Sequence, residues 1–129
     1  MKITLTALLL LLSSHLNVRA EATIILVTGA PGEAEFAAGF TKQAAAWKEA
    51  AKKGGARVIE IGGGPEDKDK PDGDTLRTTL AAEKPDGQDA LWLVLNGHGT
   101  WDGKVARFNL RGADVSADDY RLVLLEGKT

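Results

Sequence analysis

The residues of this 129-residue chain that could do chemistry gather around one histidine. His98 lies between Gly97 and Gly99, directly after the apolar run of residues 91–95. An imidazole can serve as a general acid or base near neutral pH. Glycines on both sides leave the backbone bare, so a reacting carbonyl oxygen could approach the amide N–H of Gly99. The pattern predicts His98 as a proton-transfer group; the alternative is a histidine that caps a strand end or hydrogen-bonds a neighbouring loop.

Other common catalytic and binding patterns are missing from the sequence. The chain has no cysteine, and beyond residue 20 His98 is the only histidine and Ser116 the only serine. We expect no metal, because one histidine without an evident carboxylate set does not make a zinc site. Ser116 stands in no Gly-x-Ser-x-Gly elbow, which argues against an α/β serine hydrolase. The glycine-containing loop of residues 29–32 lacks the spacing of phosphate-binding loops, so we expect no nucleotide cofactor.

Residues 1–20 have the pattern of a secretory signal peptide. Lys2 precedes an apolar core at residues 3–12, and the segment ends in Val18-Arg19-Ala20. About ten apolar residues are too few for a transmembrane helix, which needs about twenty. We expect cleavage after Ala20, a secreted or periplasmic location and no membrane association afterwards. Residues 21–129 would carry fourteen basic and eighteen acidic residues, a net charge of −4, which does not favour nucleic acid as a partner.

The elements that must position His98 alternate between strand and helix. Residues 23–28 are apolar on both alternations, which predicts a strand covered on both faces. Residues 33–53 predict a helix that ends at Gly54-Gly55. Its expected buried stripe is Phe36, Phe40, Ala44, Trp47 and Ala51. A strand at 57–61, a surface loop at 62–73, a helix from Asp74 or Thr75 to about Glu83 and a strand from near Ala90 follow.

This β-α-β-α-β order predicts an α/β fold, a three-layer sandwich with a parallel sheet, in a single domain over residues 21–129. After His98, the Asp102-Gly103 pair predicts a hairpin turn. Ser116, with acidic residues two and three positions later, predicts the start of a last short helix that runs to Leu125. Trp47 and Trp92 are expected to be core or sheet-covering residues.

Residues 91–119 resemble the first half of caspase-like cysteine peptidases, most closely bacterial exported proteins of the legumain type. The resemblance is carried above all by Asn96-Gly97-His98-Gly99-Thr100-Trp101-Asp102-Gly103 and by Phe108-Asn109-Leu110-Arg111-Gly112. The turn of residues 27–32 is similar too. The resemblance implies a caspase-like fold, in which the third strand delivers the catalytic His-Gly and the fourth the catalytic Cys. It implies that His98 is the general acid or base and that the Gly99 amide is an oxyanion donor.

The chain departs from that family at the nucleophile, since there is no thiol to attack a scissile carbonyl. It also has no arginine directly after the first strand. We therefore expect residues 21–129 to be an incomplete caspase-like domain, with about three main strands and a hairpin. This would be the N-terminal part of an exported peptidase, inactive on its own, with a peptide or protein substrate only if a missing C-terminal half completes it.

A missing fourth strand would lie beside residues 91–95 and leave an apolar edge with unpaired backbone groups. Two other functions stay open at this stage. One is a non-catalytic peptide-binding or regulatory module of the same fold, and the other is a small structural domain without a ligand.

Overall fold

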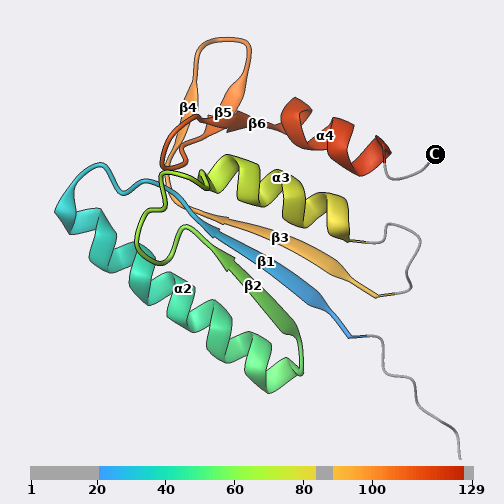
Figure 1. Cartoon of the computed structure of the whole chain (residues 1–129). Helices are drawn as coiled ribbons and strands as arrows, with labels where there is room; N and C mark the ends of the chain where they lie inside the picture. The colour runs from blue at the N-terminus through green and yellow to red at the C-terminus, as the bar shows by residue number, and fades with distance from the viewer. Residues whose placement is uncertain (1–20, 84–88, 127–129) are drawn as a thin grey trace, which may run out of the picture.

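The computed structural model describes residues 21–83 and 89–126, so the predicted signal peptide lies outside the described residues. The chain is mixed α/β, as predicted (Figure 1). Its elements are β1 (Thr23–Thr28), α2 (Ala34–Gly54), β2 (Arg57–Ile61), α3 (Asp72–Ala82), β3 (Leu91–Asn96), β4 (Gly99–Trp101), β5 (Ala106–Phe108), β6 (Val115–Ser116) and α4 (Ala117–Glu126).

The main sheet is parallel and has the order β2-β1-β3. Central strand β1 is buried along its whole length, because β2 and β3 pair on either side and helices cover both faces. At the middle of the sheet, Ile25 stands between Ile59 of β2 and Leu93 of β3. The parallel sheet predicted from the strand-helix alternation is thus confirmed, and among the described strands β3 forms one of its edges.

Alternate residues of β1 point to two separate apolar clusters, one on each face of the sheet. On one face, Ile24 and Leu26 pack with Ala44 and Ala51 of α2. On the other face, the buried cluster comprises Ile25, Val27, Ile61, Leu76, Leu80 and Leu110, which joins β1 to α3 and to the segment after β5. Figure 1 shows α2 on one side of the sheet and α3 on the other, with α4 beyond α3.

The predicted buried stripe of α2 includes two aromatic residues that are exposed in the structure. Phe40, Ala44 and Ala51 are buried, whereas the side chains of Phe36 and Trp47 are exposed. The small alanines carry the close contact with the sheet, and Trp47 lies at the margin of that contact. The predicted end of the helix is confirmed, because Gly55 adopts a left-handed conformation and its N–H donates to carbonyl groups of the last turn.

The expectation of a surface loop through residue 73 is wrong at its end, because α3 begins at Asp72. The carboxylate of Asp72 is buried, and it accepts two hydrogen bonds from Arg111, at 2.7 Å from Nε and 2.9 Å from Nη2. Arg111 also donates to the carbonyl oxygen of Gly64 at 2.6 Å. This bidentate ion pair fixes the first turn of α3 to the segment after β5.

A second, antiparallel sheet follows His98, with the strand order β4-β5-β6. The predicted turn is confirmed, since Asp102 accepts hydrogen bonds from the amides of Lys104 and Val105, each at 2.9 Å. Gly103 has φ +94°, a conformation that favours glycine. The predicted helix start is confirmed as well, because α4 begins after Ser116, whose amide and hydroxyl donate to the carboxylate of Asp119.

Candidate site around His98

His98 directly follows β3, at the carboxyl end of the parallel sheet. Ligands of open α/β sheets bind at this end of the strands. The side chain is half-buried. The prediction that His98 follows the end of a strand is confirmed, and the structure adds the direction of its ring.

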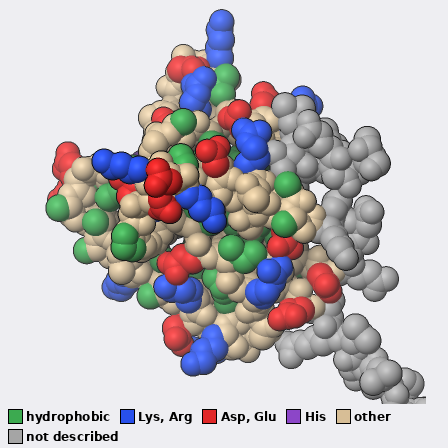
Figure 2. Space-filling view, in the orientation of Figure 1, with side chains coloured by type: hydrophobic (Ala, Val, Ile, Leu, Met, Phe, Trp, Pro, Cys, Tyr) green, Lys and Arg blue, Asp and Glu red, His purple; other side chains and the backbone are tan. Residues whose placement is uncertain are grey.

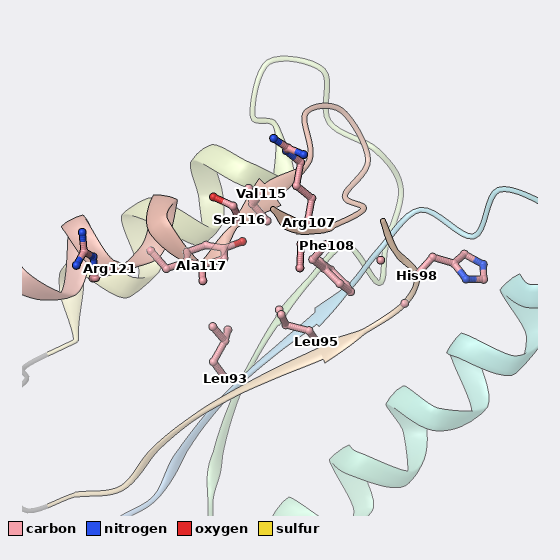
Figure 3. Close-up of a pocket in the computed structure, with 13 residues that line it drawn as sticks. Leu93, Leu95, His98, Arg107, Phe108, Val115, Ser116, Ala117 and Arg121 are labelled. Carbon is pink, nitrogen blue, oxygen red and sulfur yellow. The ribbon is translucent and has the colours of Figure 1, made fainter. Parts of the chain in front are cut away.

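The imidazole ring of His98 is held against α2. Its centroid lies 4.7 Å from that of Phe36 and 5.0 Å from that of Phe40, both in edge-on geometry. Its Nε2 lies 3.2 Å from the carbonyl oxygen of Pro31, so this nitrogen carries the proton when the hydrogen bond forms. Figure 3 shows the ring directed toward α2 and away from Leu93 and Leu95.

Asn96, the last residue of β3, ties the end of the strand to α2. It is buried, and its Nδ2 donates to the carbonyl oxygen of Phe40 at 2.9 Å. The same nitrogen lies 3.5 Å from the hydroxyl of Thr28 on β1. Asn96 therefore fixes the backbone just before the Gly-His-Gly segment. The sequence motif around His98 includes Asn96 but predicts no role for it, although a polar residue at the end of an apolar run is the available signal.

Gly97, against Phe108, and Gly29, against Phe108 and Asn109, are packed too closely to carry a side chain. A Cβ on Gly97 would lie 3.0 Å from the ring of Phe108 and 3.2 Å from the Cα of Gly29. A Cβ on Gly29 would collide with the carbonyl oxygen of Asn109. The sequence argument assigned the glycines beside the histidine to substrate approach. For Gly97, close packing against Phe108 is the role that the geometry supports.

Gly99 lies on β4, opposite Phe108 of β5. The amide of Asn109 donates to the carbonyl oxygen of His98 at 3.0 Å. His98 and Asn109 therefore form a hydrogen-bonded pair of the antiparallel ladder, directly before the pair of Gly99 and Phe108. Hydrogen-bonded and non-bonded pairs alternate along such a ladder. The N–H of Gly99 is therefore directed away from β5, so the ladder does not use it.

An apolar groove, here called the β3 groove, runs between β3 and the second sheet. Its volume is about 860 Å³, and its lining includes Leu93, Leu95, Phe108, Val115, Ala117 and Tyr120 (Figure 3). Burial raises the pKa of the Tyr120 phenol to about 12. Within the described part of the chain, the Tyr120 hydroxyl is buried and has no hydrogen-bond partner. The groove is thus a surface for apolar groups.

The outer edge of β3 borders this groove and carries exposed apolar side chains. Leu91 is 40% exposed, Trp92 56% and Leu95 43%. The expectation that Trp92 covers the sheet is wrong, because no described strand or helix lies beyond β3 to bury it. The expected apolar edge beside residues 91–95 is present in the structure.

No family model matches this chain, and neither does any curated protein or solved structure.

Two further features of the described residues bear on the kind of site. No three His, Asp or Glu side chains among them gather in a way that could hold a metal ion. None of the helices over residues 21–83 and 89–126 is long and apolar enough to cross a membrane. Figure 2 shows acidic and basic side chains interspersed over the face in view.

Proposed function

We propose that this chain supplies the histidine of a Cys-His pair in a caspase-like cysteine peptidase, and that the thiol comes from a further strand that docks on β3. The observation that supports this most is the position of His98, directly after an open apolar edge strand that borders a groove. The sequence itself has no cysteine, so the chain is inactive by itself.

The direction of β3 explains why a docked strand would complete the site. Carboxyl ends of parallel strands meet at the same edge of a sheet, as those of β1, β2 and β3 do here. A fourth parallel strand beside β3 would end next to His98. A cysteine at its last position would then bring its thiol to the imidazole, and the apolar residues of that strand would cover Leu93 and Leu95.

In the proposed reaction, His98 takes the proton of the thiol and the thiolate attacks the carbonyl carbon of a peptide bond. The negative charge on the carbonyl oxygen is stabilised by the N–H of Gly99. His98 then protonates the leaving amine as the C–N bond breaks, and water hydrolyses the acyl-enzyme with His98 as the base. The ring must first leave the carbonyl of Pro31 and turn toward the groove.

A non-catalytic peptide-binding module of the same fold is the second candidate. The ring of His98 favours it, because two phenylalanines and the Pro31 carbonyl hold the imidazole away from the β3 groove. An extended peptide would then bind by strand addition to β3, with its alternate side chains in the groove.

The test begins with the nucleotide sequence that follows the codon of Thr129. The peptidase proposal expects an apolar strand ending in Cys, in frame or after a frameshift. The joined polypeptide should cleave fluorogenic peptides, and His98→Ala should lower kcat/KM by about 10²–10⁴-fold. Trp101→Ala, on the exposed hairpin, serves as the matched control and should leave kcat/KM unchanged.

Two results would overturn the peptidase proposal. One is the absence of any such strand, and the other is activity that survives His98→Ala. If the chain instead binds peptides by itself and no thiol-reactive probe labels the complex, then the binding module is the correct function.

A further inference from the structure

We propose that β3 is a self-association edge: when no other strand occupies it, two copies of this chain pair antiparallel through β3 about a two-fold axis at Leu93. The two main sheets would then join into one six-stranded sheet. This inference does not depend on the chemistry of His98.

The backbone of β3 presents a regular set of hydrogen-bonding groups at the outer edge. The carbonyl oxygen of Ala90 accepts from Thr23, and that of Asn96 accepts from Gly29, so the even-numbered residues of the strand face β1. Backbone groups alternate in direction along a strand. The N–H and C=O groups of Leu91, Leu93 and Leu95 therefore face outward, where a second strand would meet them.

This edge lacks the features that usually keep sheet edges apart. Edge strands of soluble proteins are commonly interrupted by a charge, a proline or a bulge. The sequence Leu-Trp-Leu-Val-Leu-Asn of β3 has no charged residue and no proline. Three of its large side chains, Leu91, Trp92 and Leu95, are exposed. The edge is thus both open to pairing and costly to leave in water.

An antiparallel pair centred on Leu93 is self-complementary. Leu93 would face its copy, Leu91 would face Leu95, and Trp92 would face Val94. All of the outward backbone groups would then form hydrogen-bonded pairs, since these pairs join odd-numbered residues. Leu93 packs with the cluster on the α3 face and Val94 with that on the α2 face. A shift by one residue would place leucines against the wrong face.

Charge also favours a second copy as the occupant. In the centred register, the paired strands bring no two charged side chains together, because β3 has none. Asp89 would lie opposite Gly97 of the second copy, which has no side chain. The paired strands and their ends therefore place no two acidic side chains against each other.

The β3 groove supplies the apolar contact area for such a pair. Leu93 and Leu95 line the groove, together with Phe108 and Tyr120. A two-fold axis perpendicular to the sheet keeps the α3 face of both copies on the same side. The leucines of the second copy would therefore lie along the groove of the first copy, and those of the first along the groove of the second. This arrangement would bury the exposed apolar surface of both copies equally.

Sedimentation of the purified residues 21–129, which contain every described helix and strand, tests this pairing. We expect a monomer–dimer equilibrium. Trp92→Lys should raise the dissociation constant at least about tenfold, because it places a charge on the pairing edge. Trp101→Lys is the matched control, since Trp101 is even more exposed at 66% but lies on the hairpin. It should leave the equilibrium unchanged, and circular dichroism should show that both variants fold.

A cross-link locates the two-fold axis. The chain has no cysteine, so a single introduced thiol gives an unambiguous result. Directly paired residues have Cα atoms about 5.5 Å apart, within disulfide range. Leu93→Cys should therefore form an intermolecular disulfide on mild oxidation, and Trp101→Cys should not. A monomer at all concentrations, open-ended aggregates, or equal effects at positions 92 and 101 would overturn the proposal.

Discussion

The imidazole of His98 lies edge-on against the ring of Phe36, with centroids 4.7 Å apart and ring planes at 87°. Phe40 makes a similar contact from one turn further along α2. The side chain proposed for proton transfer therefore also anchors the Gly-His-Gly segment to α2. In the proposed reaction the ring must give up these contacts, and their loss costs free energy unless other groups replace them.

A first prediction concerns this anchoring. His98→Ala removes two aromatic contacts and the hydrogen bond to Pro31, so the free energy of unfolding should fall by about 1–2 kcal/mol. Urea denaturation followed by tryptophan fluorescence measures this change. Trp101→Ala, at a position that is 66% exposed, should alter the stability by less than about 0.5 kcal/mol. An unchanged stability of His98→Ala would show that the ring is not packed in solution.

The main elements could be predicted from the sequence because their signals are local. The apolar run of β1, the charged ends of α2 and the Asp-Gly turn each specify structure within a few residues. The orientation of His98 could not be predicted in the same way. It depends on Phe36 and Phe40, which are about sixty residues away in the sequence.

The packing role of Gly97 was hidden for the same reason. In the sequence, a glycine next to a histidine suggests backbone left open for a reacting group. In the structure, the residue that requires glycine at position 97 is Phe108, which the hairpin brings next to it. The pair of Asp72 and Arg111 joins residues 39 positions apart. Pairing over such a distance leaves no periodic pattern in the sequence, so the local signals at Asp72 predict only a surface loop.

A second prediction concerns the single tyrosine of the chain. Burial raises the pKa of Tyr120 to about 12 from the ordinary 10.0. Because the folded pKa is raised, the fold keeps its full stability below about pH 10, where the phenol is neutral in both states, and loses stability as the pH rises through 12. Absorbance at the phenolate band should therefore titrate near 12 in the folded protein. A midpoint near 10 without unfolding would contradict this burial.

The unpaired hydroxyl of Tyr120 leads to a third prediction. Its oxygen is buried and has no hydrogen-bond partner within the described residues. Removal of an unsatisfied buried polar group relieves a desolvation cost. Tyr120→Phe should therefore leave the stability unchanged or raise it by about 1 kcal/mol, as measured by thermal unfolding. Tyr120→Ala should instead destabilise, because it also removes the ring from the β3 groove. A clear loss of stability in the phenylalanine variant would reveal a partner for the hydroxyl.

A fourth prediction tests the ion pair between Arg111 and Asp72. Both side chains are largely buried, with 19% and 10% of their surface exposed. Arg111→Lys keeps the charge but cannot form the two parallel hydrogen bonds, so it should cost about 1–3 kcal/mol. Arg57→Lys, at a pair whose arginine is half exposed, should cost less than about 1 kcal/mol. Equal costs for the two lysine variants would mean that the Asp72 pair is not distinct from a surface pair.

The last prediction compares Gly29, in the turn after β1, with Gly39, inside α2. At Gly29 a Cβ would collide with the carbonyl of Asn109 and lie 3.0 Å from the ring of Phe108. Because backbone cannot yield as a flexible side chain does, Gly29→Ala should destabilise by about 1–3 kcal/mol. At Gly39, inside α2, a Cβ meets nothing within 4 Å. Gly39→Ala should therefore stabilise by about 0.5–1 kcal/mol, since alanine is the better helix former. Guanidinium denaturation of both variants measures the difference, and a tolerated alanine at position 29 would show that the turn after β1 does not pack against the hairpin.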